Sequence, residues 1–470
     1  MNNKKIFILI PDGLGLRNFA YTSFYENALK NEFEIVFWNN TSFPISELGF
    51  QELKTEIPKP HPLTDVYKNA KVHVEFNLNI KKTKDKVYNN YRFPFSYSNF
   101  KNSIKSIFVH LIILTHSSQK GLLRIRRKIN ESERKTFYYH QSLLTLKKEK
   151  PAMVFCTNQR HISTIAPLLA AKELGIPTAV CIFSWDNLPK AMLVVETDYY
   201  FVWSNHMKNE LLFYYPYILP KQIFITGSLQ FEIHYNKSKL FTREDFFIKY
   251  GLNLNKKYIC FTGDDITTSP DDPNYLEDLA LAIEKLNKRN FNLGIIFRRC
   301  PVDFSDRYNI VLKKYSHIIV SINPLWKPLS EAWNTILPTK EDGQLLSNIA
   351  EHSEMVVNIG SSTVFDFIAH KKPTGYFRYN QKKQLNNNWD IYKCYQFVHF
   401  RSMPSQKAVV WFDNPSDIAE NIIEVLSKSQ ETINEAQLWF EKINQHPVEE
   451  ASTRYLNAIQ EIITNSESNK

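Results

Sequence analysis

Two aspartates, Asp12 and Asp186, follow short apolar runs that predict buried β-strands at 5–11 and 178–183. In an open parallel sheet, the residues just beyond the carboxyl ends of the strands line the ligand site. A carboxylate in such a partly dry place can act as a general base and take the proton from an acceptor hydroxyl. We therefore identify Asp186 and Asp12, in that order, as candidate catalytic residues.

Each carboxylate also has a structural alternative that the sequence leaves open. Asp12 could cap the helix that follows it, and Asp186 could close a tight Asx turn. Around the first aspartate, we predict a loop over 12–18 and a helix over 19–30. Three neighbours of the aspartates are candidates for contact with the acceptor substrate: Arg17, Trp185 and Asn187.

A loop of small residues, Gly360-Ser361-Ser362-Thr363, separates a predicted strand from a predicted helix. Backbone N–H groups and the positive end of the helix dipole at such a loop can hold a phosphate group. We interpret the four residues as part of a binding site for the diphosphate of a nucleotide donor. The alternative is that Ser361 or Ser362 only caps the helix of an ordinary β-α unit.

Further donor-site candidates follow two other predicted strands. Arg298 and Arg299 end the strand at 294–297, and their forked guanidinium groups suit phosphate oxygens. For Arg298, the alternative is an ordinary surface arginine. Gly263 follows the strand at 258–262, where the absence of a side chain would let the nucleotide approach closely.

The sequence shows no spacing typical of metal ligands. The acidic pairs Asp264-Asp265 and Asp271-Asp272 are adjacent residues rather than an Asp-x-Asp motif. We interpret four histidines as core or surface residues: His161, His206, His352 and His370. We therefore predict no metal and no cofactor. The five scattered cysteines are typical of a reducing cytoplasm.

The alternation of short apolar runs with helical segments predicts an α/β protein with two Rossmann-like domains. We place an N-terminal acceptor-binding domain at 1–234, with a basic and aromatic insertion at about 60–150 in which we predict little regular structure. A C-terminal donor-binding domain follows at 235–428. C-terminal helices and a polar tail occupy 429–470.

The formal net charge of +10 indicates an anionic partner. Nucleotide phosphates or an acidic membrane surface fit better than nucleic acid, because no nucleic-acid-binding motif is present. The segment 101–135 joins an apolar run to a basic one, and it could lie on an anionic membrane or form one solvated helix face. No stretch reaches the roughly 20 apolar residues of a membrane span. We expect a cytoplasmic protein, or one peripheral on the inner face of the membrane.

Three stretches resemble GT-B enzymes that build bacterial surface glycans, in particular CDP-glycerol glycerophosphotransferases and related capsule glycosyltransferases. They are residues 197–211 with 223–228, residues 359–373 (IGSSTVFDFIAHKKP), and residues 183–190 (FSWDNLPK). The resemblance covers 151–377. One departure is that a histidine followed by Gly-Thr in the glycerophosphotransferase pattern corresponds to Trp185-Asp186-Asn187 here, which leaves a carboxylate as the base.

The resemblance implies the GT-B fold, with two Rossmann-like domains that face each other across a cleft. It also implies transfer of a sugar from a nucleotide-sugar, expected to be UDP-linked, to a surface polysaccharide or a lipid-linked glycan without a bound metal. Three alternatives stay open: a CDP-polyol phosphotransferase, a UDP-sugar epimerase-like enzyme and a non-catalytic nucleotide-binding protein.

Overall fold

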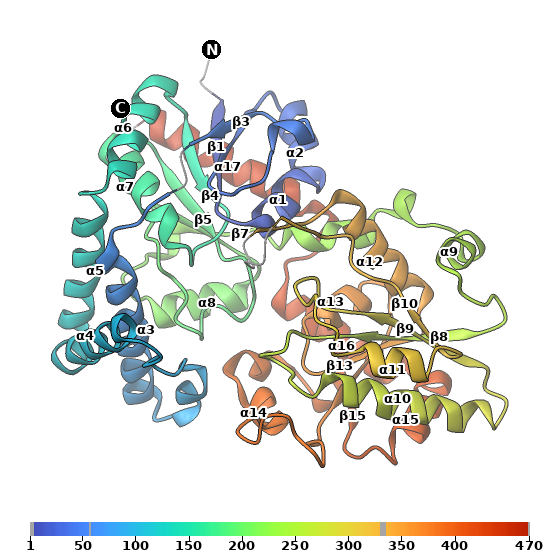
Figure 1. The fold of residues 1–470 in the computed structure, drawn as a ribbon. Coiled ribbons are helices and arrows are strands. Elements are labelled where there is room, and N and C mark those ends of the chain that lie inside the picture. Colours follow the sequence, from blue (N-terminus) through green and yellow to red (C-terminus); the bar gives the residue numbers. More distant parts are fainter. Residues whose placement is uncertain (1–3, 56–57, 330–334, 469–470) are drawn as a thin grey trace. The chain divides into compact units, whose positions relative to one another are not determined.

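A computed structural model describes residues 4–55, 58–329 and 335–468 of the chain. The chain divides into two compact units, of which unit 1 comprises 1–229 with 443–470 and unit 2 comprises 230–442 (Figure 1). Each unit is built on its own parallel β-sheet. This confirms the predicted α/β class with two Rossmann-like domains.

Unit 1 contains a seven-stranded parallel sheet in the order β3-β2-β1-β4-β5-β6-β7. Its strands are β1 (Lys5–Ile10), β2 (Glu34–Asn39), β3 (Glu52–Lys54), β4 (Met153–Cys156), β5 (Thr178–Cys181), β6 (Tyr199–Val202) and β7 (Ile223–Ile225). Because neighbouring strands are parallel, their carboxyl ends share one edge. The chain order reverses between β1 and β4, and open α/β sheets bind ligands at such a switch point.

The helices of unit 1 include one that arrives from the far end of the chain. They are α1 (Gly13–Ala20), α2 (Ser23–Lys30), α7 (Ile165–Glu173), α8 (Asn205–Tyr214) and α17 (Ala451–Ser468), besides those of the insertion. The buried Tyr455 of α17 joins an aromatic cluster with Phe19, Phe155 and Phe201, at centroid distances of 5.7, 6.0 and 5.2 Å. Burial of these rings fixes α17 in unit 1.

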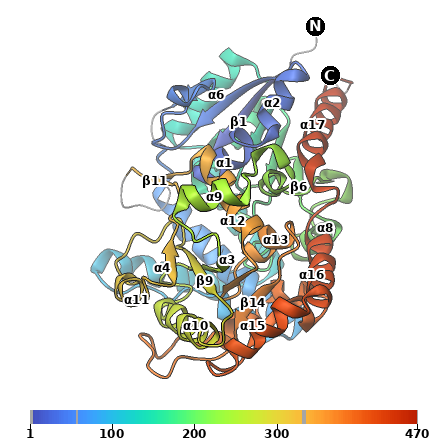
Figure 2. The same cartoon turned by 90° about the vertical axis from the view of Figure 1, so that its right-hand side faces the viewer.

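The C-terminal helices therefore do not form the separate segment that we predicted at 429–470. The first of them, α16 (Gln430–Ile443), packs in unit 2, where Trp439 and Phe440 lie 5.0 and 5.7 Å from Phe365 (Figure 2). The boundary between the units also falls at 229/230 rather than at 234/235. Apolar periodicity predicts that such helices are amphipathic, but it does not indicate which sheet covers their apolar face.

The insertion is more regular than predicted, because helices make up most of it and are not confined to the segment 101–135. It comprises α3 (Pro62–Thr83), α4 (Phe100–His116), α5 (Gln119–Glu133) and α6 (Phe137–Glu149). Pro62 does not break the chain there, because proline suits the first position of a helix, and His61 caps the same helix. In the described ranges, no helix is sufficiently long and apolar to span a bilayer.

Unit 2 contains a six-stranded parallel sheet in the order β10-β9-β8-β13-β14-β15. Its strands are β8 (Lys257–Thr262), β9 (Leu293–Arg298), β10 (Ile319–Ser321), β13 (Met355–Asn358), β14 (Thr374–Phe377) and β15 (Val410–Phe412), and a separate antiparallel pair is β11 (Lys327–Pro328) with β12 (Ile336–Leu337). The switch point of this sheet lies between β8 and β13. The Gly360–Thr363 loop follows β13 and therefore lies at that point.

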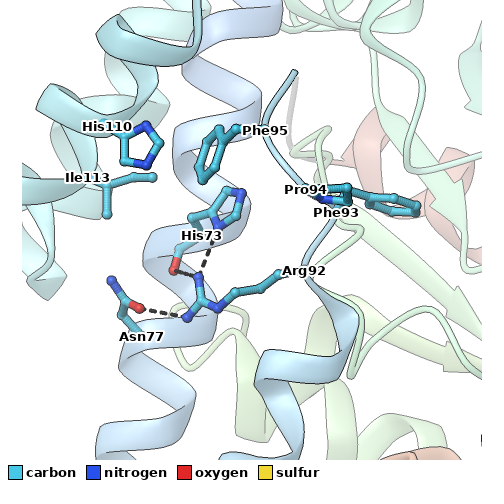
Figure 3. Close-up of a pocket in the computed structure, with 8 residues that line it drawn as sticks. All are labelled: His73, Asn77, Arg92, Phe93, Pro94, Phe95, His110 and Ile113. Carbon is cyan, nitrogen blue, oxygen red and sulfur yellow. Dashed lines mark hydrogen bonds between the residues drawn. The ribbon is translucent and has the colours of Figure 1, made fainter. Parts of the chain in front are cut away.

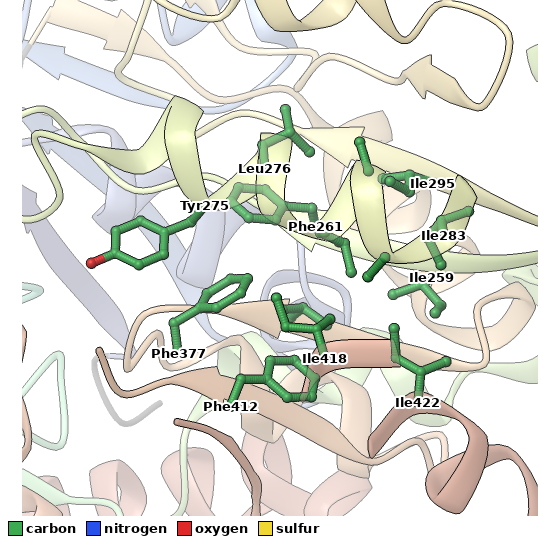
Figure 4. Close-up of a cluster of buried hydrophobic side chains, with 14 of the residues drawn as sticks. Ile259, Phe261, Tyr275, Leu276, Ile283, Ile295, Phe377, Phe412, Ile418 and Ile422 are labelled. Atoms are coloured by element: carbon green, nitrogen blue, oxygen red, sulfur yellow. The ribbon is translucent and has the colours of Figure 1, made fainter. Parts of the chain in front are cut away.

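The core of unit 2 lies on both faces of its sheet. Its helices are α9 (Arg243–Tyr250), α10 (Asp272–Asn287), α11 (Asn309–Lys314), α12 (Lys340–His352), α13 (Thr363–Ile368), α14 (Ile391–Gln396) and α15 (Ile418–Ser427), besides α16. Figure 4 shows Ile283 of α10 and Ile422 of α15 with the strand residue Ile259 in one cluster. On the other face, Ile349 of α12 packs with Cys260.

Replacement of Tyr455 tests the assignment of α17 to unit 1. We expect Tyr455→Ala to lower the free energy of unfolding by about 3–5 kcal/mol, because it leaves a cavity among buried aromatic rings. Urea unfolding followed by circular dichroism checks this, with the exposed Asn457→Ala on the same helix as control. Equal unfolding midpoints for the two variants would contradict the assignment.

Candidate functional site

At the switch point of unit 1, a buried carboxylate meets a histidine. Asp12 follows β1 and is only 1% exposed. Its Oδ1 accepts a hydrogen bond from the Gly15 N–H at 3.1 Å, and its Oδ2 accepts one from Asn158 Nδ2 at 2.6 Å. His161 Nε2 lies 2.9 Å from Asp12 Oδ2, and 22% of the His161 side chain is exposed. The contact with His161 is an ion-pair contact that lacks the alignment of a good hydrogen bond.

Asp12 and His161 meet because β1 and β4 are parallel neighbours. Asp12 is the N-cap of α1, so most of the loop predicted over 12–18 is helical instead. Gly15 allows α1 to approach β4, since a Cβ at this position would lie 2.3 Å from Thr157 Oγ1. The capping alternative for Asp12 is therefore correct, and it coexists with the contact to His161.

The environment of Asp12 determines which group of the pair can take up a proton. Burial by itself raises the pKa of Asp12, but His161, the Gly15 N–H and Arg160 together lower it below the ordinary value of 3.8. Asp12 is thus ionised at neutral pH and accepts protons poorly. Its charge can stabilise the imidazolium that forms when a neighbouring histidine takes up a proton. The arrangement therefore favours His161 as the proton acceptor, with Asp12 as the residue that positions it.

The second candidate carboxylate, Asp186, is linked to the same edge through Arg160. The Arg160 guanidinium attracts both Asp12 and Asp186, and it lies 5.0 Å from the centroid of the Phe183 ring. Burial lowers the pKa of Arg160, and the two carboxylates oppose this effect. The tertiary structure thus brings both candidate bases into the electrostatic range of one cation.

Asp186 itself closes the turn that follows β5. Its Oδ1 accepts hydrogen bonds from Ser184 Oγ at 2.6 Å and Asn187 Nδ2 at 2.8 Å, and its Oδ2 forms an ion pair with Lys190. The structural alternative, in which Asp186 closes a tight loop, describes these contacts. Proton uptake by Asp186 would weaken them, because they favour the ionised carboxylate. Its role as a base stays a prediction.

The three candidates for acceptor contact differ in exposure. Trp185 and Asn187 are buried, and Asn187 Oδ1 accepts a hydrogen bond from Gln159 Nε2 at 2.7 Å. Arg17 lies on α1, is half-buried and donates from Nε to Asn18 Oδ1 at 3.0 Å. Burial gives Trp185 and Asn187 a supporting role in the turn, so Arg17 is the better candidate of the three.

Sequence reasoning missed Arg160 and His161. Both follow β4, which is the neighbour of β1 at the switch point. The rule that selected Asp12, a polar residue after a predicted strand, applies equally to this segment. The spacing typical of metal ligands does not reveal a histidine paired with a carboxylate, because the parallel pairing of β1 and β4 brings the two groups together. In the part of the chain that the structure describes, no group of three or more possible ligands is arranged to hold a metal.

In unit 2, the loop after β13 is organised by an asparagine. Asn358 Nδ2 donates to Thr262 Oγ1 at 3.0 Å and to Thr363 Oγ1 at 2.9 Å, and Asn358 Oδ1 accepts from the Ser361 N–H at 3.1 Å. Gly360 adopts a left-handed φ of +62°, where a Cβ would also lie 2.9 Å from the Phe400 ring. Ser362 is exposed and its side chain makes no capping hydrogen bond to α13. Ser362 is therefore the hydroxyl of this loop that is best placed to contact a ligand.

Gly263, at the end of β8, has a different reason to be a glycine. A Cβ there would lie 2.7 Å from Tyr308 Oη and 3.2 Å from Asp272 Oδ2, so protein atoms occupy the adjacent space. The next residue, Asp264, is a buried carboxyl whose pKa is raised well above its ordinary value by burial and by the nearby Asp272 and Asp265. Asp264 therefore lies at the switch point with a greater tendency to hold its proton than an ordinary aspartate.

Arg298 ends β9 and Arg299 follows it. Both side chains contact other protein groups rather than extend into solvent. Arg298 is 4% exposed, and its Nη2 donates to both oxygens of Asp342 at 2.9 Å. Asp342 also accepts from the Leu325 N–H and from Trp326 Nε1. Arg299 Nη1 donates to the backbone carbonyl of Asp303 at 3.3 Å. The surface alternative for Arg298 is therefore wrong, and the predicted phosphate contact would compete with a buried ion pair.

Comparison with known proteins agrees with this architecture. No protein-family model matches the chain, and no curated protein does. Solved structures with the same arrangement include a glycosyltransferase from Rickettsia africae, at 10% identity and a TM-score of 0.52 over 99% of this chain and 100% of that one. The chain has the GT-B fold.

Two further similar structures are those of an epimerase of UDP-GlcNAc and of a protein solved with UDP. The UDP-GlcNAc 2-epimerase from Methanocaldococcus jannaschii has 13% identity and a TM-score of 0.51, over 97% of this chain and 99% of that one. S. aureus MnaA, in a co-structure with UDP, has 14% identity and a TM-score of 0.50, over 97% and 96% of the two chains. At these identities the likeness establishes the fold, and the reaction has to be argued from the residues.

The charge of Asp12 can be tested through the pH dependence of stability. Because its pKa is lowered on folding, the ionised carboxylate contributes stability above its ordinary pKa of 3.8, and this contribution is lost as the pH falls through the folded value. We expect Asp12→Asn to cost about 1–3 kcal/mol in urea unfolding at pH 7, with a difference from the native protein that shrinks below pH 3.8. The exposed, ion-paired Asp413→Asn should cost about 0–1 kcal/mol at pH 7. A cost for Asp12→Asn that does not change with pH would contradict the role of the charge.

A second pair of variants compares the stability contributions of Arg298, in a buried ion pair, and Ser362, in the loop after β13. Arg298→Ala leaves Asp342 buried without its cation, and we expect it to lower the free energy of unfolding by about 3–5 kcal/mol. Ser362→Ala, at an exposed hydroxyl, should change it by less than about 0.5 kcal/mol. Thermal unfolding of both variants measures this. An Arg298→Ala protein as stable as the native one would show that the ion pair is unimportant.

Proposed function

We propose that the protein is a glycosyltransferase that moves a sugar from a nucleotide-sugar to a surface polysaccharide or a lipid-linked glycan. The observation that carries the proposal is the Asp12–His161 pair at the switch point of unit 1. A buried, ionised carboxylate against a partly exposed histidine is an arrangement suited to general-base catalysis. The GT-B fold is consistent with the proposal, since proteins of similar fold include a glycosyltransferase.

In the proposed reaction, the acceptor hydroxyl attacks the anomeric carbon of the sugar and gives its proton to His161. A bond forms between the acceptor oxygen and the anomeric carbon. The bond from that carbon to the diphosphate breaks, and its electron pair leaves with the nucleoside diphosphate. Asp12 stabilises the resulting imidazolium, and Arg160 supplies a positive charge at the same edge.

The nucleotide donor is assigned to the switch point of unit 2. Ser361, Ser362 and Thr363 would contact the diphosphate through N–H and hydroxyl groups, and Asp264 in its protonated form could donate to an oxygen of the nucleotide. A UDP-linked donor is favoured because S. aureus MnaA, which has a similar fold, was solved with UDP. The proposed reaction requires no bound metal.

A UDP-sugar epimerase-like activity is the second candidate, because the M. jannaschii protein of similar fold is a UDP-GlcNAc 2-epimerase. The two activities differ in the need for an acceptor. An epimerase converts the nucleotide-sugar by itself, whereas a transferase releases nucleoside diphosphate and extends the acceptor. Product analysis with UDP-GlcNAc alone and with a lipid-linked glycan therefore distinguishes them.

The first test is a thermal-shift panel with UDP, GDP, CDP, CMP and ADP, since a ligand that binds the folded state raises the melting temperature. We expect one nucleoside diphosphate to raise it, and we expect Ser362→Ala to reduce that shift. Turnover is then measured as release of the nucleoside diphosphate from the matching nucleotide-sugar with acceptor present. His161→Ala should keep the shift and lose turnover by about 10²–10⁴-fold.

Asp186→Asn tests the other candidate for the general base and is compared with His161→Ala. If Asp186→Asn abolishes turnover while His161→Ala retains it, the base is Asp186 and the assignment to His161 is wrong. A panel without any shift would contradict the donor site. Nucleotide binding with no consumption of any nucleotide-sugar would favour a non-catalytic binding protein.

A further inference from the structure

Helix α4 of the insertion exposes its apolar face instead of burying it. Among the residues of this 17-residue helix, only Ser106 and Val109 are buried. Phe100 and Leu114, near its two ends, are 82% and 78% exposed. A helix on the surface of a soluble domain normally has the opposite pattern, with its apolar stripe towards the core.

The exposed apolar side chains form one stripe. We define the α4 patch as Phe93, which precedes the helix, and five residues of the helix: Phe100, Ile107, Phe108, Leu111 and Leu114. Phe100, Ile107, Leu111 and Leu114 are separated by seven, four and three residues, and Phe108 lies three residues before Leu111. This spacing places all five on one side of the helix. Ser106 and Val109 lie on the opposite side, where α4 packs on α3 and α5. Exposed apolar patches of this kind mark interaction surfaces.

Basic side chains are exposed on α5, the helix that follows α4. The two helices are joined by a tight turn, since a Cβ at Gly121 would lie 2.2 Å from the carbonyl oxygen of His116. Lys120, Arg124 and Arg127 are exposed on α5, whereas Arg126 is directed to Glu196 in an ion pair. Arg126 is thus engaged within the protein, whereas Lys120, Arg124 and Arg127 are left at the surface of α5.

A surface pocket beside the patch adds a further cation. It has a volume of ≈ 390 Å³ and is lined by Phe93, Phe95 and Ile113 together with Arg92 (Figure 3). Arg92 Nη1 lies 2.9 Å from His73 Nδ1, and Arg92 Nη2 donates to Asn77 Oδ1 at 2.7 Å. Burial and the Arg92 charge lower the pKa of His73 to about 4, so this histidine is neutral and Arg92 carries the charge of the pocket.

We propose that the α4 patch is a docking surface for an anionic phospholipid bilayer. The apolar stripe would enter the region between headgroups and acyl chains, and the exposed basic residues of α5 would contact the phosphates of the headgroups. Interfacial helices combine these two features, and their binding depends on both apolar area and charge. This inference does not depend on the proposed enzymatic function, because it rests on unit 1 residues outside the candidate site.

The charge pattern favours a bilayer over a protein partner or a second copy of the chain. The core of a protein interface is depleted of charged residues. Here the exposed cations Lys101, Lys120, Arg124 and Arg127 come from the same two helices as the apolar stripe. Another copy of this chain, with its net charge of +10, would repel these cations, whereas anionic lipid attracts them.

The test is co-sedimentation of the full chain with large unilamellar vesicles of phosphatidylcholine and phosphatidylglycerol (3:1) and with vesicles of phosphatidylcholine alone. We expect binding to the anionic vesicles and at least tenfold weaker binding to the neutral ones. Phe108→Glu/Leu111→Glu should reduce binding to the anionic vesicles at least tenfold. Leu144→Glu/Ile310→Glu, which changes two exposed apolar residues on α6 and α11, is the matched control and should bind like the native protein.

The basic residues and the salt dependence provide a second arm. Arg124→Glu/Arg127→Glu and 0.5 M NaCl should each weaken binding to anionic vesicles, because these contacts are screened and electrostatic. Equal binding to both kinds of vesicle, or no binding, would overturn the proposal. Sedimentation velocity that shows a native dimer dissociated by Phe108→Glu/Leu111→Glu would also overturn it, and would assign the patch to a contact between copies.

A labelled variant keeps the proposal testable if the charged substitutions disturb folding. Leu111→Cys carrying an environment-sensitive fluorophore should become brighter and shift to the blue when anionic vesicles are added. The same label at Leu144→Cys should not respond. An unchanged signal at position 111 in a protein with a native melting temperature would overturn the proposal.

Discussion

The candidate site of unit 1 depends on the burial of one negative charge. Asp12 is almost inaccessible to water, and a buried carboxylate is tolerated only when donors and opposite charge compensate for the loss of hydration. The compensation comes from two segments: the start of α1 and the side chains that follow β4, Arg160 among them. These segments can meet only at the carboxyl edge of β1 and β4, so the strand order of the sheet determines the chemistry at this edge.

The two units repeat one topology with different chemistry at the switch point. In unit 1 the edge carries full charges, with Asp12, Asp186, Arg160 and Lys190 within one set of loops. In unit 2 it carries hydroxyl groups, the Asn358 amide and Asp264, a carboxyl group whose pKa is raised. The first set suits proton transfer, whereas the second suits hydrogen bonds to a polar ligand. The same fold can therefore hold two different partial sites, which is why the GT-B fold alone does not identify a reaction.

Much of this architecture could be predicted from the sequence. The apolar runs placed most strands of both sheets to within one or two residues, because buried parallel strands are short and almost wholly apolar. The short edge strands β3 and β15 were not predicted. Asp12, Asp186 and the Gly360–Thr363 loop were found because polar residues after such strands must lie at one edge. The insertion was predicted only in part. Its apolar and basic runs indicated a helix within 101–135, whereas α3 and α6 were not predicted.

What the sequence by itself determined is most of the strands, their parallel class and the residues that follow them. Tertiary structure alone decided the partners of those residues, because hydrogen bonds and ion pairs join segments that are far apart in the chain. Asp12 meets His161 across about 150 residues of sequence, and Arg298 forms a buried ion pair with Asp342. It also decided that α17 completes unit 1, since apolar periodicity defines a buried face but does not specify what covers it.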